Sequence, residues 1–99
     1  MKTRTEAIHF TADKKLLDFI EKKTSKLHQF FDRITDIDMK LKLENSGQVR
    51  DKIAEVKVQL PGTVLFVKEH DKTFETAIDA AVDSLAKQLI KYKERKSEN

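Results

Sequence analysis

Two segments in the middle of the chain alternate strictly between apolar and polar residues, and this period of two constrains the fold more than any other feature. In the first segment single polar residues separate four apolar ones, Ile37, Met39, Leu41 and Leu43. Residues 54–60 repeat the pattern. Successive side chains of a strand point to opposite faces, so both segments are predicted to be strands with one buried face. Helices can therefore cover only one face of the sheet, while the other face stays open and polar.

The first third of the chain is predicted to form a short strand and then a helix. The strand covers residues 3–10, and Thr11 is the predicted N-cap of a helix that ends near Phe31, with Asp13 in its first turn. One broad face of this helix carries the predicted core residues, Leu16, Leu17, Ile20, Thr24, Leu27, Phe30 and Phe31. Lysines flank this face, with Lys15, Lys22 and Lys26 in a row and Lys23 close by.

The last third is predicted to form a hairpin strand and a long helix. Pro61-Gly62 predicts a type II turn into a strand over residues 63–69. The earlier connection, which begins with a turn at Asn45-Ser46-Gly47 and continues through Arg50, is predicted to be mobile. Residues 71–73 offer caps for a helix over residues 73–96, whose buried stripe is Phe74, Ile78, Ala81, Val82, Leu85, Leu89 and Tyr92.

The predicted element order is β-α-β-β-β-α in a single domain that spans residues 1–96, with a frayed C-terminal end at residues 97–99. The fold class is α+β, a two-layer sandwich with two helices on one face of a four-stranded sheet. Because both helices share one layer, their basic flanks are expected to face each other across a shared groove.

Charge is distributed unevenly along the final helix, which begins acidic and ends basic. Ser84, Lys87, Lys91 and Arg95 form a row beside its buried stripe, at a spacing that would let the cations reach one nucleic-acid backbone. The same distribution also suits the helix macrodipole, which favours acids at the N-terminus and bases at the C-terminus. Both interpretations stay open on charge alone.

The aromatic residues, among them Phe66, are predicted to be mostly core residues by their periodicity. Phe19 and Tyr92 lie near the basic flanks and are the two candidates for base stacking, although core packing is favoured for both. The expected interface is therefore lysine to phosphate, without specific base reading.

Composition excludes several classes of protein. The chain has 99 residues, a net charge of +3 and no cysteine, so a disulfide framework, a thiolate zinc site and a cysteine nucleophile are excluded. Its longest apolar run, residues 64–67, is far shorter than the roughly 20 residues that span a bilayer. The N-terminus lacks the apolar core of a signal peptide, so a cytoplasmic protein without a membrane partner is expected.

No enzyme site emerges from the polar residues. His9, His28 and His70 are too scattered for a metal site, and Asp79 and Asp83 are better explained as solvated helix acids, paired with Lys87, than as cation ligands. With only Gly47 and Gly62 in the chain, a glycine-rich phosphate loop is impossible. We expect no catalytic residues, no metal, no cofactor and no small-molecule substrate.

Two stretches of the chain form a distinctive pattern, residues 17–34, with the run from Leu17 through Lys23 to Ile34, and residues 77–93, with Ala77-Ile78-Asp79 and Lys91-Tyr92-Lys93. Through these stretches the chain resembles the short ribosome hibernation promoting factors and related ribosome-associated translation inhibitors of bacteria, and the strand over residues 54–62 also fits that family. The resemblance implies a fold similar to a double-stranded-RNA-binding domain with an extra N-terminal strand. It also implies a translation silencer that binds the small ribosomal subunit between head and body, in the channel for messenger and transfer RNA.

The resemblance implies that basic side chains on the two helices contact rRNA. In this chain they are Lys22, Lys23, Lys26, Lys87, Lys91 and Lys93. Arg95 joins this set from the charge pattern. The resemblance adds a basic ribosomal protein as an alternative partner for the acids of the final helix, which are otherwise explained as solvated. The chain departs from the family pattern at Thr73, Glu75 and Ser84, which affects contacts near the start of the final helix.

The chain stops soon after the final helix, so it is expected to lack the C-terminal domain with which long members pair ribosomes, as well as the extended tail of some relatives. Two other functions remain open. A general double-stranded-RNA module would bind a plain duplex as well as a ribosomal subunit, and a protein-interaction domain would use the open sheet face or the final helix.

Overall fold

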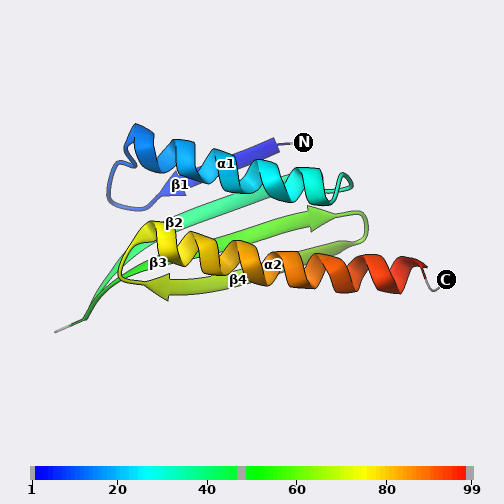
Figure 1. The fold of residues 1–99 in the computed structure, drawn as a ribbon. Coiled ribbons are helices and arrows are strands. Elements are labelled where there is room, and N and C mark those ends of the chain that lie inside the picture. Colours follow the sequence, from blue (N-terminus) through cyan, green and yellow to red (C-terminus); the bar gives the residue numbers. More distant parts are fainter. Residues whose placement is uncertain (1, 47–48, 98–99) are drawn as a thin grey trace.

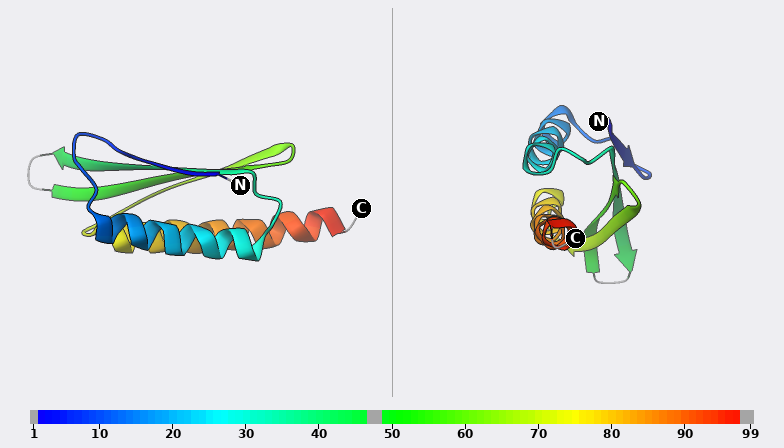
Figure 2. Two further views of the ribbon diagram at one scale, coloured as in Figure 1. Left: turned by 90° about the horizontal axis from the view of Figure 1, so that it is seen from above. Right: turned by 90° about the vertical axis from the view of Figure 1, so that its right-hand side faces the viewer.

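The computed structural model describes residues 2–46 and 49–97 and confirms the predicted order of elements. Its elements are β1 (Lys2–Ala7), α1 (Lys14–Phe30), β2 (Asp36–Ser46), β3 (Val49–Leu60), β4 (Thr63–Asp71) and α2 (Phe74–Ser97). Both helices lie on the same face of the sheet, so the fold is the predicted two-layer α+β sandwich (Figures 1 and 2).

The sheet has the order β1-β2-β3-β4, with β1 parallel to β2 and the other pairs antiparallel. Helix α1 connects two parallel strands and must run back against both, and α2 runs back after β4, which has the direction of β2. The two helices are therefore parallel to each other (Figure 1). Phe10 stacks on Phe74 where the helices begin, and Phe31 meets the edge of Tyr92 near their ends.

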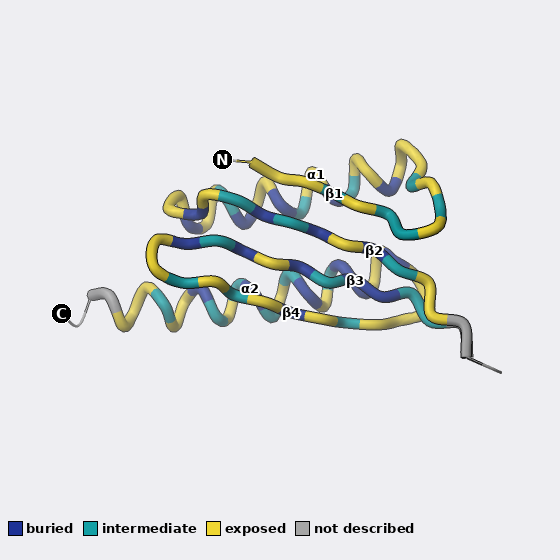
Figure 3. Tube along the Cα trace, turned by 180° about the vertical axis from the view of Figure 1, so that it is seen from behind, coloured by how far each residue is buried: buried dark blue, intermediate teal, exposed yellow. Residues whose placement is uncertain are grey.

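The hydrophobic core lies between the sheet and the helical layer, as the alternation predicts (Figure 3). Its sheet side consists of every second residue of the central strands, including Ile37, Met39, Leu41, Ala54, Val56, Val58 and Leu60. Its helical side includes Leu16, Ile20 and Leu27 from α1 and Ile78, Leu85 and Leu89 from α2. The prediction was wrong for Leu17 and Phe30, which point to the edges of α1 and are exposed.

Polar caps and one glycine fix the ends of the elements. The N-cap of α1 is Asp13, whose carboxylate accepts a hydrogen bond from the Leu16 amide at 2.8 Å, so the prediction of Thr11 was wrong by two residues. Thr73 caps α2 as predicted, because its hydroxyl accepts a hydrogen bond from the Thr76 amide. Gly62 has φ 74°, the value that the second central position of the predicted turn requires.

Two segments differ from their sequence-based predictions. Strand β1 ends at Ala7 rather than at Phe10, because His9 adopts φ 63° and turns the chain towards the helical layer. The pairing of β2 with β3 continues outward to Ser46 and Val49, where a mobile connection was predicted. Gly47 of the predicted turn lies outside the described residues, as do the last two residues of the predicted frayed end, while α2 runs through Ser97.

Candidate nucleic-acid interface

Lysines on the outer surface of α1 form the first part of the candidate interface. Lys22 and Lys26 are exposed, and within residues 2–46 and 49–97 neither forms an ion pair. Lys15 is also exposed, about two turns nearer the start of the helix than Lys22. These side chains leave three ammonium groups available to a polyanion on one helix surface, as the sequence predicted.

Lys23, in contrast, is turned towards the second helix. Its Nζ lies 2.7 Å from Asp79 Oδ1 of α2 and 5.3 Å from the centre of the Phe19 ring. Its side chain is only 24 % exposed. The same ion pair corrects the predicted partner of the α2 acids, because Asp79 pairs with Lys23 rather than with Lys87.

Helix α2 carries the second part of the interface. Lys87 and Lys91 are exposed, and neither is in an ion pair within the described part of the chain. Lys91 and Arg95 line a shallow recess of about 190 Å³ together with Thr63 and Leu65 of β4. This flank of α2 therefore faces the β4 edge of the sheet and points away from α1.

Lys93 lies on the opposite flank of α2, against the end of α1. Its Nζ is 5.2 Å from the ring centre of Phe30 and 5.7 Å from that of Phe31. Cations at this distance from aromatic rings are attracted by the ring quadrupole. Phe30, which the sequence placed in the core, thus forms a partly exposed platform for a lysine of the other helix.

The expected groove with two facing lysine rows is not formed. At about 100° per residue, Asp79 and Lys93 fall within about 40° of each other on α2, whereas Lys91 points about 160° away from Lys93. Since Asp79 contacts α1 and the recess beside β4 is lined by Lys91 and Arg95, these two cations lie on the other side of α2. Lys87 is about 80° from Asp79 and points outward between the two sides. The predicted cations therefore occupy three kinds of place, namely the outer surfaces of the two helices, the contact between the helices, and the β4 side of α2.

The two aromatic candidates for stacking are both partly covered. Phe19 lies beneath Lys23, and Tyr92 packs edge-on against Phe31 at 5.4 Å between ring centres. The Tyr92 hydroxyl donates a hydrogen bond to the Pro61 carbonyl at 3.2 Å. These contacts agree with the favoured interpretation, in which both rings pack against the core.

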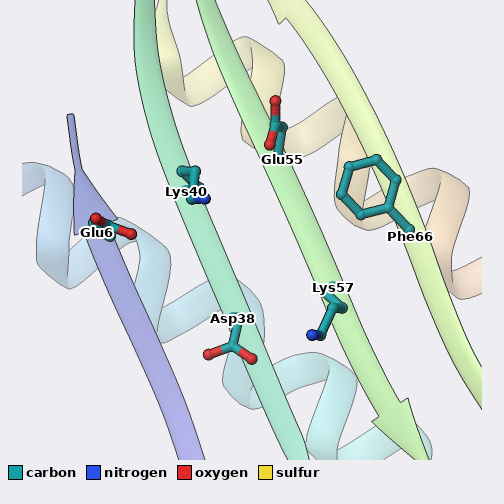
Figure 4. Close-up of a pocket in the computed structure, with 6 residues that line it drawn as sticks. All are labelled: Glu6, Asp38, Lys40, Glu55, Lys57 and Phe66. Atoms are coloured by element: carbon teal, nitrogen blue, oxygen red, sulfur yellow. The ribbon is translucent and has the colours of Figure 1, made fainter.

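The open face of the sheet carries acidic and basic side chains next to one another. Six side chains from all four strands line a depression there, namely Glu6, Asp38, Lys40, Glu55, Lys57 and Phe66 (Figure 4). Arg4 binds Asp38 at 2.7 Å, which raises the pKa of Arg4, and Lys42 binds Glu55 at 2.8 Å. Alternating signs of charge make this face less suited than the helical layer to binding a polyanion.

Phe66 and Val64 of β4 are exposed on this open face, at 56 % and 50 %. The prediction that Phe66 is a core residue was wrong. The run Val64-Leu65-Phe66-Val67 is apolar throughout, so the sequence does not show whether the even-numbered or the odd-numbered residues of this strand face the core. The pairing of Val56 with Val67 decides it by placing Val67 in the core and Phe66 outside.

Among residues 2–46 and 49–97, no group of three or more histidine, aspartate and glutamate side chains is arranged to hold a metal ion. Within the same part of the chain, no helix is long and apolar enough to cross a membrane. His28 lies apart from the other histidines, and burial lowers its pKa.

The fold and the exposed lysines define a small α+β domain with a basic helical layer and a mixed-charge sheet face. Residues 3–97 match the family described as sigma 54 modulation protein / S30EA ribosomal protein, and the chain belongs to this family. The resemblance noted in the sequence is thereby confirmed.

The chain is similar to named proteins of two different lengths. The chain is 37 % identical over 78 residues to the ribosome hibernation promoting factor of Klebsiella oxytoca, a match that covers 79 % of the chain and 78 % of the relative. It is 36 % identical over 93 residues to the ribosome hibernation promotion factor of Picosynechococcus, covering 92 % of the chain. The chain spans 44 % of the length of that longer relative.

Solved structures support the same fold. A ribosomal subunit interface protein from Coxiella burnetii superposes with a TM-score of 0.83 over 95 % of the chain and 99 % of that structure, and its identity of 22 % supports the fold alone. The N-terminal domain of Thermus thermophilus Protein Y is 30 % identical, with a TM-score of 0.68 over 92 % of the chain and 94 % of that domain.

Proposed function

We propose that this chain is a ribosome hibernation factor that silences translation without being an enzyme. It binds the small ribosomal subunit in the channel that messenger and transfer RNA occupy, and its helical layer contacts rRNA. Occupation of this channel excludes both RNAs and keeps the idle ribosome intact. This role places the protein in the cytoplasm, where ribosomes reside.

The observation that carries the proposal is the exposure of four lysines on the helical layer of a chain from this family. Lys22 and Lys26 of α1 and Lys87 and Lys91 of α2 are exposed and form no ion pair in the described residues. Matching relatives carry the name of ribosome hibernation factors. Arg95 extends the α2 row to the recess beside β4.

The chemistry of this surface favours phosphate over bases. Lysine ammonium groups bind phosphate as point charges, while the aromatic rings nearest to them are engaged in packing. Recognition would then depend on the shape of the folded RNA and on counterion release. Binding should weaken steeply as salt is added.

The test is cosedimentation of the protein with ribosomes in sucrose gradients at several salt concentrations. The variant K22E/K26E/K87E/K91E should lose binding, and the K22E/K26E pair alone should weaken it. The matched control is K40E/K57E, which reverses two exposed lysines of the open sheet face and should bind as the wild type does. Retention of binding by the fourfold variant would reject the proposal for this surface. Equal affinity for a plain RNA duplex and for intact subunits would instead indicate a general double-stranded-RNA module.

One observation favours a second candidate, a protein-interaction domain that uses the open sheet face. Phe66 and Val64 are half exposed there beside side chains of both charge signs, a composition common at protein interfaces. This function predicts association with a protein partner that survives nuclease treatment. It also predicts that F66E abolishes this association, whereas the fourfold lysine variant does not.

A further inference from the structure

The line of contact between α1 and α2 contains two cations that the sequence assigned to RNA binding. We infer that Lys23 and Lys93 are positioning residues, which clamp the two helices together and so fix the separation of the lysine rows that bind RNA. We call Lys23, Asp79, Phe30 and Lys93 the helix seam. The inference rests on the proposed function and divides its predicted contact residues into two groups.

The first clamp is the ion pair between Lys23 and Asp79. The pair has a separation of 2.7 Å, and the Lys23 side chain is held from a second direction by the Phe19 ring. A phosphate that approached Lys23 would meet a charge already neutralised by Asp79. Taking Lys23 away from this partner would leave a carboxylate facing the RNA, which repels it. The geometry therefore assigns Lys23 to the protein rather than to the ligand.

The second clamp is the contact of Lys93 with the aromatic end of α1. Its ammonium lies over Phe30 and Phe31 at 5.2 and 5.7 Å from the ring centres. Asp79 and Lys93 are separated by 14 residues, which corresponds to about 21 Å along a helix that rises about 1.5 Å per residue. Two contacts at this separation restrict both the distance between the helices and the angle at which they cross.

The contact between the helices determines how far apart the RNA-binding lysine rows are. The α1 row lies on the outer surface of α1 next to the seam, because Lys26 is about 60° from Lys23 on the helix, whereas Lys91 and Arg95 lie on the far side of α2, beside β4. Their spacing is then a property of the seam. A loosened seam would let the rows drift relative to a folded RNA whose phosphates are fixed.

The experiment uses the salt dependence of ribosome binding, which distinguishes phosphate contacts from positioning residues. The slope of log K against log salt falls by about 0.7–0.9 for each phosphate contact removed. We expect K22M and K91M to reduce the slope by this amount. K23M and K93M should leave the slope unchanged while weakening binding by about threefold, a size typical of an exposed ion pair or cation–π contact.

A charge swap provides the decisive comparison. K23D should bind more weakly than K23M, and the double variant K23D/D79K should recover wild-type affinity within about threefold, because the pair is rebuilt in reverse. A slope loss in K23M equal to that in K22M would overturn the inference, as would a folded swap variant that binds no better than K23D. If the swap variant does not fold, the slope of K23M alone decides.

Failure of the proposed function would be seen separately. If the wild type shows no salt-dependent binding to ribosomes, the proposed function is wrong, and the clamp is then tested by unfolding without ribosomes. A double-mutant cycle of K23M and D79N should show non-additive losses of stability. Additive losses would overturn the clamp independently of any ribosome.

Discussion

Replacement of Leu85 by alanine should show how far the fold depends on the contact between α2 and the sheet. Leu85 lies in the middle of α2, is 0 % exposed and belongs to the main hydrophobic cluster. The substitution removes the three carbons beyond Cβ, which at about 0.8 kcal/mol each contribute about 2.4 kcal/mol of transfer free energy. The cavity left behind raises the expected loss to about 3–4 kcal/mol. A domain of this length has a free energy of unfolding of about 5–15 kcal/mol, so the variant should stay folded but be clearly weakened.

The assay is urea unfolding followed by circular dichroism, with the slope against denaturant checked for constancy. Ile90→Ala on the same helix is the matched control. Ile90 is 43 % exposed, and its loss should be under about 1.5 kcal/mol. Alanine is a good helix former, so helix propensity cannot account for a loss at either site. Equal destabilisation by the two substitutions would refute the assignment of Leu85 to the core and Ile90 to the surface.

Three further substitutions, at the cap of α1, at the β3–β4 turn and at His28, should have smaller effects on stability. Asp13→Ala should destabilise the protein by about 1 kcal/mol in urea unfolding through loss of the α1 cap, whereas Thr11→Ala should change stability by no more than about 0.5 kcal/mol. Gly62→Ala should lower stability by about 1 kcal/mol, because φ 74° strains any residue with a Cβ even though the space around it is open. Burial lowers the pKa of His28, so the unfolded chain binds its proton more readily and the free energy of unfolding should fall as pH drops below about 6.5. In urea titrations at several pH values, His28→Gln should reduce that fall, and an unchanged pH profile would contradict the reasoning.

Much of the fold could be predicted because local patterns and tertiary structure agree. Alternation at Ile37, Met39 and Leu41 set which side of β2 is buried, and the structure buries that side. The prediction was less accurate where the chain changes direction. Thr11 and Asp13 are both good N-caps, and the sequence does not show that His9 turns the chain first and moves the start of α1 to Lys14.

The sequence shows which lysines lie on the two helices, but it does not show how these lysines are arranged around the contact between the helices. A helical wheel gives the angle between Lys91 and Lys93, but it does not say on which side of α2 the other helix lies. That side depends on the strand order, because β1 pairs beside β2 and brings α1 to the flank of α2 away from β4. Likewise Phe66 could be assigned to the open face only from the register of β4 against β3.

The parallel arrangement of the two helices gives the molecule an electrical polarity. In an antiparallel pair the peptide dipoles would largely cancel, whereas here they add, with both amide ends at one pole and both carbonyl ends at the other. Asp13 and Glu75 lie at the amide pole, and Lys91 and Lys93 lie near the carbonyl pole. At each pole the side chains therefore carry a charge opposite in sign to the partial charge of the backbone. The dipoles of both helices thus have the same direction in any external electric field. A ligand that binds at one end of the helical layer meets amide groups with acidic side chains, and at the other end it meets carbonyl groups with lysines.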